Sequence, residues 1–124
     1  MTYSHSDSPS KNGLEIEEYQ KMLDEMNRIF SDYPRELSDK EDAEHVITTA
    51  DSLCEIYSGL RDFHKRLGDR RYSESTRQEM KRILDDAGLI IDKVIGHVIL
   101  LNDNDRVPKT FRHLYDKIIY TPRH

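Results

Sequence analysis

Six histidines are the side chains of this 124-residue sequence best suited to metal binding or proton transfer: His5, His45, His64, His97, His113 and His124. No two of them stand three or four residues apart, the spacing that places two ligands on one helix face. Asp42 and His45 form a single Asp-x-x-His, whereas a di-iron helical bundle needs two Glu-x-x-His units and two further glutamates. We therefore predict no metal and no cofactor, and we expect His97 to be a hydrogen-bonded structural residue.

The nucleophilic side chains form no catalytic pattern. Cys54, the single cysteine, falls within an apolar helical stripe, so it is expected to be buried and poorly reactive. The sequence contains no Gly-x-Ser-x-Gly elbow and no glycine-rich phosphate loop. On these grounds we expect a protein that is not an enzyme.

The composition is typical of a soluble protein. Charged residues make up 35% of the chain, against roughly 25% in an average globular domain. No apolar run reaches the roughly 18 residues that a membrane span needs, and residues 1–12 lack the basic start and apolar middle of a secretory signal. A single cysteine cannot form an intrachain disulfide. The expected location is therefore the cytoplasm, with no membrane contact.

The elements that must position any site are predicted to be helices. Apolar residues recur at steps of three and four through most of the chain, which is typical of amphipathic helices. A first helix is expected over 14–33, after a disordered tail of residues 1–12. The second helix is expected to begin at a capping box made by Ser38 and Glu41 and to end at Gly68.

The third helix is expected to begin at a second capping box, Ser75 with Gln78, and to end near residue 102. Pro108 suits the first turn of a shorter fourth helix, and residues 122–124 are expected to form a C-terminal tail. Short connections make successive helices antiparallel. The prediction is an all-α, antiparallel bundle of three long helices plus a short C-terminal fourth, in one domain over 13–121. An extended hairpin that oligomerises is the alternative.

Ionisable side chains are unevenly distributed along the chain. Residues 14–44 include eleven acidic and four basic residues, a net charge of −7, whereas residues 61–82 include eight basic and four acidic residues, a net charge of +4. The first two connections of an antiparallel bundle lie at opposite ends, so we expect one acidic end and one basic end. The helix macrodipole explains part of this pattern, because it favours acids at helix starts and bases at helix ends.

The segment 61–82 is the first candidate binding surface, and we refer to it as the basic cluster. Its members are Arg61, His64, Lys65, Arg66, Arg70, Arg71, Tyr72, Arg77, Lys81 and Arg82. Three of them, Arg77, Lys81 and Arg82, stand in the first two turns of the third helix, where cations oppose the dipole. We expect carboxylates of the first two helices, an acidic protein partner or a phosphate to neutralise them, and Tyr72 and His64 to be available for stacking on a base.

The third helix is the second candidate surface, because its C-terminal half is apolar most of the way round. At 100° per residue, Leu89, Gly96 and Leu100 fall nearly opposite the core stripe, with Ile99 on its flank. One interpretation is burial, either under the fourth helix or at the centre of the bundle. The other is an interface with a partner or a second copy, with Gly96 allowing close approach of another backbone.

One stretch has a family resemblance. Residues 90–118 read as an apolar helix, then Val107-Pro108, then a further apolar helix. This stretch resembles part of the small helical HEPN ribonucleases of toxin and antitoxin systems. The resemblance implies that an Arg and a His, four to six residues apart on one helix, cut RNA across a dimer. Arg106 and His113 have that spacing, although Pro108 lies between them and Val107 replaces the usual polar neighbour.

The sequence favours a non-enzymatic interaction protein of the inhibitor, immunity or adaptor type. Its partner is expected to be a protein, acidic at the contact, bound through the charged bundle end and the apolar surface of the third helix. Homo-oligomers through the same surface are an open alternative. A HEPN-like ribonuclease or toxin-antitoxin component, and a module binding nucleic acid or a phosphate ligand through the basic cluster, are the two other hypotheses.

Overall fold

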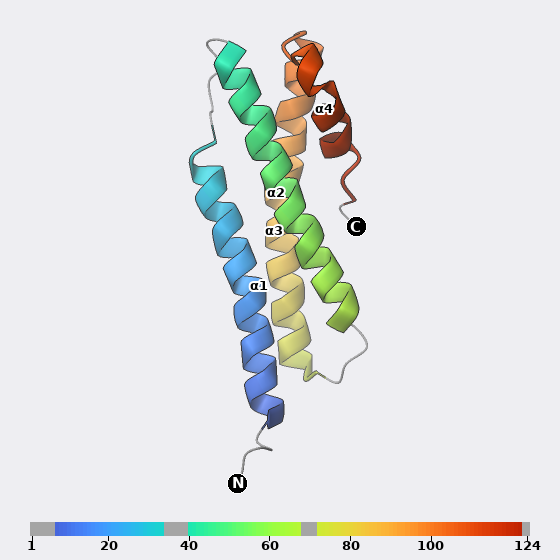
Figure 1. Ribbon diagram of the computed structural model, residues 1–124. Coiled ribbons are helices and arrows are strands. Elements are labelled where there is room, and N and C mark those ends of the chain that lie inside the picture. Colours follow the sequence, from blue (N-terminus) through green and yellow to red (C-terminus); the bar gives the residue numbers. More distant parts are fainter. Residues whose placement is uncertain (1–6, 34–39, 68–71, 123–124) are drawn as a thin grey trace.

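The computed structural model describes residues 7–33, 40–67 and 72–122, with side chains described over 16–33, 43–66 and 72–122. Three long helices, α1 (Asp7–Ser31), α2 (Lys40–Leu67) and α3 (Glu74–Asp103), run alternately up and down. A 3-10 turn, η1 (Lys109–Phe111), leads into α4 (Arg112–Ile119), as Figure 1 shows. The all-α bundle of three long helices and a short fourth is confirmed.

Two helix starts differ from their prediction. α1 begins at Asp7, whereas it was expected to begin at residue 14, so residues 7–12 are helical and do not belong to the predicted disordered tail. Pro9 in the first turn is tolerated because amides there have no helical partner. α3 begins at Glu74, and its cap is Ser73, whose hydroxyl accepts a hydrogen bond from the Thr76 amide at 3.2 Å. The capping box predicted at Ser75 is therefore wrong by two residues, because Ser73 already has the extended backbone that a cap needs.

The three long helices bury one face each in a common core. The side chains with no exposed surface include Tyr19 and Met26 of α1, Val46 and Leu53 of α2, and many aliphatic residues of α3. Cys54 is 2% exposed, as its position in the apolar stripe predicted. At roughly 25 cal/mol per Å² of apolar surface, this shared core is the main source of stability.

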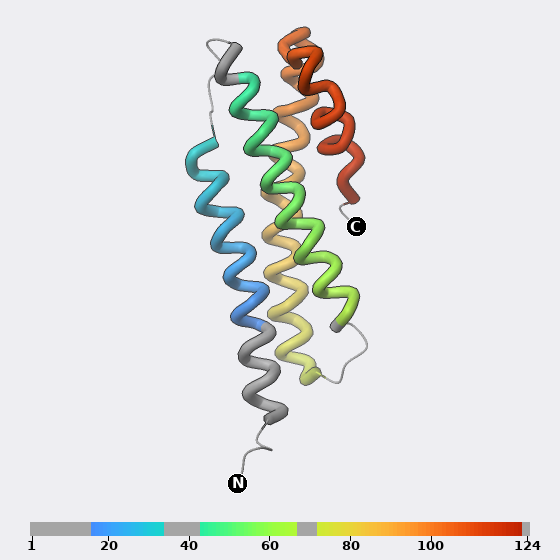
Figure 2. Tube along the Cα trace, viewed as in Figure 1, coloured from blue at the N-terminus to red at the C-terminus, as the bar shows by residue number. Residues whose placement is uncertain are grey.

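The short helix α4 docks on α2 and α3, away from α1, and occupies only one end of the bundle (Figure 2). Ile118 is fully buried beneath it and Tyr115 is 7% exposed. Lys117 extends its ammonium to α2, 2.8 Å from Glu55 Oε1 and 3.1 Å from Asp51 Oδ1. On the opposite edge, Arg112 donates a hydrogen bond to Asn102 of α3 at 2.9 Å. α4 thus turns an apolar face toward α2 and α3, with Lys117 on its α2 side and Arg112 on its α3 side.

His97 packs between helices by a ring contact, in place of the predicted hydrogen bond. Its ring meets the Tyr33 ring edge-on, with centroids 5.2 Å apart, and no hydrogen bond joins it to another described residue. Partial burial lowers the pKa of His97 below its usual value near 6.5.

This lowered pKa predicts a pH dependence of stability. Below about pH 6.5 the unfolded chain binds a proton at His97 that the folded chain resists, so stability falls as the pH drops from there through the folded pKa. Above that window the contribution is complete. Denaturant unfolding of the wild type and His97→Leu from about pH 7.5 to 5 measures it. The variant is expected to lose less stability over this range, and equal losses would contradict the assignment to His97.

Candidate protein-binding groove

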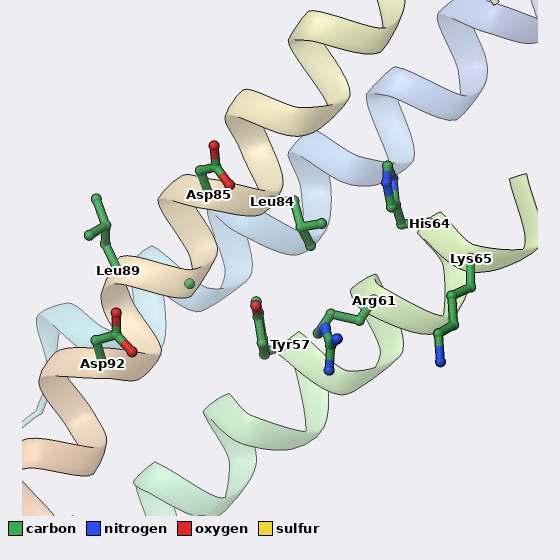
Figure 3. Close-up of a pocket in the computed structure, with 9 residues that line it drawn as sticks. Tyr57, Arg61, His64, Lys65, Leu84, Asp85, Leu89 and Asp92 are labelled. Atoms are coloured by element: carbon green, nitrogen blue, oxygen red, sulfur yellow. The ribbon is translucent and has the colours of Figure 1, made fainter. Parts of the chain in front are cut away.

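α2 and α3 form a cleft on the side facing α4, and the half of it that α4 leaves uncovered is a groove with a volume of about 480 Å³. Tyr57 and Leu84 point into the space between the two helices, as Figure 3 shows. The remaining lining residues are Arg61, His64 and Lys65 of α2 and Asp85, Gly88, Leu89 and Asp92 of α3. The groove therefore has an apolar floor and charged edges.

The groove and the α4 contact are successive parts of one cleft. Residues seven apart share a helix stripe, and two such steps connect Asn102, which contacts α4, to Gly88, which lines the groove. On α2 the same spacing, taken twice, connects Asp51 under α4 to Lys65 in the groove. A helix lying in the groove would thus continue the position of α4.

Gly88 brings the two helices close together on the groove floor. A Cβ at this position would lie 3.4 Å from the Tyr57 hydroxyl, at the edge of ordinary contact, so a larger side chain would displace Tyr57. Tyr57 itself is only 2% exposed and belongs to the core. The floor of the groove therefore belongs to the packed core, whereas Lys65, Asp85, Leu89 and Asp92 on its edges are exposed.

The two edges of the groove carry opposite charges. Arg61 and Lys65 stand along α2, and Asp85 and Asp92 stand along α3 (Figure 3). Among the described residues neither Lys65 nor Asp85 forms an ion pair. Within the described part of the chain, Lys65 and Asp85 therefore have no partner of opposite charge.

A second hollow of about 380 Å³ lies beside the groove at the end of the bundle. It shares His64, Leu84 and Asp85 with the groove, and its remaining lining residues are Tyr19, Tyr72, Arg77, Met80 and Lys81. His64 lines both hollows. Its Nδ1 lies 2.7 Å from the Tyr19 hydroxyl, and this contact connects α1 to α2. Arg77 and Lys81 form no ion pair within the described part of the chain.

The structure divides the predicted basic cluster into parts. Arg61, His64 and Lys65 line the groove, whereas Tyr72, Arg77 and Lys81 line the second hollow with His64. Arg66 lies over the Phe63 ring at 5.9 Å. Arg70 and Arg71 lie outside the described residues, as do the predicted cap Ser38 and the helix end Gly68.

Arg82 is paired with carboxylates of its own helix and needs no external anion. Its guanidinium pairs with Glu79 at 3.0 Å and with Asp86 at 2.9 Å, both on α3 itself. These pairs follow from the three- and four-residue spacing that places side chains together on one helix face. The predicted neutralisation of Arg82 by α1, α2 or a ligand is therefore wrong.

The predicted separation of an acidic end from a basic end is also weaker than expected. α1 runs antiparallel to α2, so its acidic first half lies beside the basic end of α2. Tyr19 of α1 contacts Phe63 and His64 of α2, and Glu17 and Glu18 immediately precede it. Glu17 and Glu18 thus lie near the basic end of α2 and partly offset the basic cluster.

The apolar surface of α3 remains uncovered by α4. Leu89 is 59% exposed, Leu100 56% and Ile99 41%. Gly96 is also exposed, with no atom within 4 Å of a Cβ placed there. Burial under α4 is therefore excluded for these side chains. Leu89 belongs to both surfaces, since it forms part of the groove edge.

Five residues of the groove were missed by sequence reasoning. Tyr57 and Leu84 matched the core stripes, and Asp85, Gly88 and Asp92 matched no motif. The short length of the predicted fourth helix is the signal that could have indicated the groove, because a helix of that length cannot cover the whole cleft between two long helices. Only the docking position of α4 shows which half stays open.

The structure also bears on the ribonuclease, metal and membrane hypotheses. Arg106 stands in the turn before η1 and His113 is exposed on α4, so the two do not share one helix as the HEPN resemblance implies. Within the described residues no three His, Cys, Asp or Glu side chains are grouped to hold a metal ion. None of the helices there has the length and apolarity to span a membrane.

Comparisons with protein-family models, with curated proteins and with solved structures found no significant match to this chain.

Proposed function

We propose that this protein acts by binding another protein, without a catalytic step, as an inhibitor, immunity protein or adaptor does. The binding surface combines the groove with the exposed apolar residues of α3. The observation that supports this most is the exposure of Leu89, Ile99 and Leu100 on a helix whose opposite face is fully buried. Aliphatic side chains grouped beside a groove are typical of interaction sites.

Capture from extracts of the native host tests the proposal. The full chain is immobilised as wild type, Leu89→Asp or Leu100→Asp, and bound proteins are identified by mass spectrometry. Tyr120→Asp is the matched control, because Tyr120 is an 80% exposed aromatic residue at the C-terminal cap of α4. A specific partner lost with both leucine variants and retained by the control supports the proposal. A partner retained by all three variants contradicts it.

Solution mass measurement separates a partner protein from a second copy. A homo-oligomer that dissociates in Leu100→Arg would make this surface a self-association interface. A monomer in both forms leaves the surface to another protein.

Two glycines give a matched pair of variants for the same surface. Gly59 on α2 and Gly96 on α3 are both helical, and a Cβ at either meets no atom within 4 Å. Each change to Ala is expected to raise the free energy of unfolding by about 0.8–1 kcal/mol through helix propensity. Denaturant unfolding measures this gain. If Gly96 admits a partner's backbone, only Gly96→Ala weakens partner binding, whereas equal binding by both variants removes Gly96 from the interface.

A second candidate function is binding of a phosphate-bearing ligand such as single-stranded nucleic acid. It is supported by the second hollow, where Arg77 and Lys81 stand beside the Tyr72 ring. Retention of an RNA oligonucleotide is then expected to fall with salt, and Arg77→Ala or Lys81→Ala should each reduce the logarithmic slope by about 1. Absence of retention at low salt would eliminate this candidate.

A further inference from the structure

We propose that the groove binds an amphipathic helix of the partner, with acidic side chains toward α2 and basic side chains toward α3. This inference rests on the proposed protein-binding function and specifies what the partner presents. Three features carry it: the continuity of the groove with the α4 site, the opposite charges of its edges, and the exposure of Leu89.

α4 is an example, within this chain, of how the cleft receives a helix. It inserts Tyr115 and Ile118 between α2 and α3 and places one polar contact on each side. The groove offers the same kind of surface one step further along, with Tyr57 and Leu84 as its floor. An apolar stripe of three- and four-residue spacing is the shape that such a cleft accepts.

The charge on the α2 side reverses where α4 ends. Under α4 the α2 stripe presents Asp51 and Glu55, which hold Lys117 and raise its pKa chiefly through the hydrogen bond to Glu55. In the groove the same side presents Lys65, which forms no ion pair with another described residue. An occupant of the groove therefore needs acidic residues where α4 has a lysine.

On the α3 side the groove presents Asp85, which also lacks an ion pair among the described residues, so an occupant needs a basic residue there. Edges of opposite sign also fix the direction of the bound helix, because reversal would exchange its flanks and place like charges together. The α4 helix of a second copy is a poor match in the direction of the chain's own α4, since its Lys117 would face Lys65. A partner helix with mixed flanks is the matching occupant.

Two synthetic peptides test this charge pattern against the full-length protein. The first copies residues 109–121, and the second is the same peptide with Lys117→Glu. By the geometry of α4, position 117 faces α2 and Arg112 faces α3. The second peptide therefore has the proposed pattern. It is expected to bind about threefold more tightly, the size of one exposed charge pair. Backbone amide shifts in labelled protein report both affinity and location.

Reversal of the protein's own charge gives the matched variant. Lys65→Glu is expected to exchange the preference, so that the unmodified peptide binds more tightly. Lys65 is exposed, so the change leaves the core intact. Shifts centred on Lys65, Gly88 and Leu89, together with the exchanged preference, support the inference. Equal affinities, absence of binding by either peptide, or shifts centred on the α4 contact would overturn it. In that case, loss of the native partner in Leu89→Asp would still support the proposed function, so the proposed function and the helix-binding inference can fail separately.

Discussion

Tyr57→Ala is expected to destabilise the protein by about 3–5 kcal/mol, the range for removing a buried aromatic ring. Tyr57 is 2% exposed, contacts the core on α2 and forms the groove floor opposite Gly88. Its removal leaves a cavity that the surrounding helices fill only in part. Because native domains are stable by about 5–15 kcal/mol, this single change consumes a large share of the total. Denaturant unfolding followed by circular dichroism measures the loss.

Tyr57→Phe is the control for this prediction. It keeps the ring and removes only the hydroxyl, so the expected loss is about 0.5–1.5 kcal/mol. A loss from Tyr57→Ala no larger than that from Tyr57→Phe would contradict the role of the ring in packing. It would also show that the floor of the groove is not part of the packed core.

Ile118→Ala is expected to cost about 2–5 kcal/mol, limited by the free energy that docks α4 on the bundle. Ile118 is fully buried, and the remaining attachments of α4 include the exposed ion pairs of Lys117, which contribute little. Amide hydrogen exchange resolves where the loss falls. Protection is expected to disappear across α4 while α1, α2 and α3 keep theirs, since elements at the edge of a fold open locally.

Ile119→Ala is not a suitable control for α4, because Ile119 is partly buried and packs on the core. Tyr120→Ala is suitable, since Tyr120 is 80% exposed at the C-terminal cap of the same helix. It should change the free energy of unfolding by less than about 0.5 kcal/mol. Equal exchange in α4 of the wild type and Ile118→Ala would show that α4 is held by something other than this side chain.

Much of the fold follows from sequence because its pattern is local. Apolar spacing located every helix, since a face one stripe wide repeats at the helical period whatever lies opposite it. Caps were less predictable. Ser73 and Ser75 have the same side chain, and only the backbone at Ser73 is extended so as to receive the Thr76 amide. Helix starts are thus decided by conformation that the residue type alone does not specify.

The candidate site was only partly predictable because it depends on how α4 docks. Lys65 and Leu89 were each identified from sequence, one by charge and one by its place opposite the core stripe. Nothing in the spacing of either helix indicated that they line one groove. The prediction for Arg82 was wrong for the opposite reason. Its partners Glu79 and Asp86 lie three and four residues away on the same helix, so the local spacing alone indicates both ion pairs.

Photo-crosslinking in the native host tests the central claim most directly. A photoreactive amino acid is placed at Leu89 on the groove edge or at Tyr120 just after α4, and irradiated cells are analysed for adducts of this chain. The account predicts a discrete adduct with another protein from position 89, weakened by Lys65→Glu, and none from position 120. Adducts that are identical from both positions, or absent from position 89, would contradict protein binding at the groove.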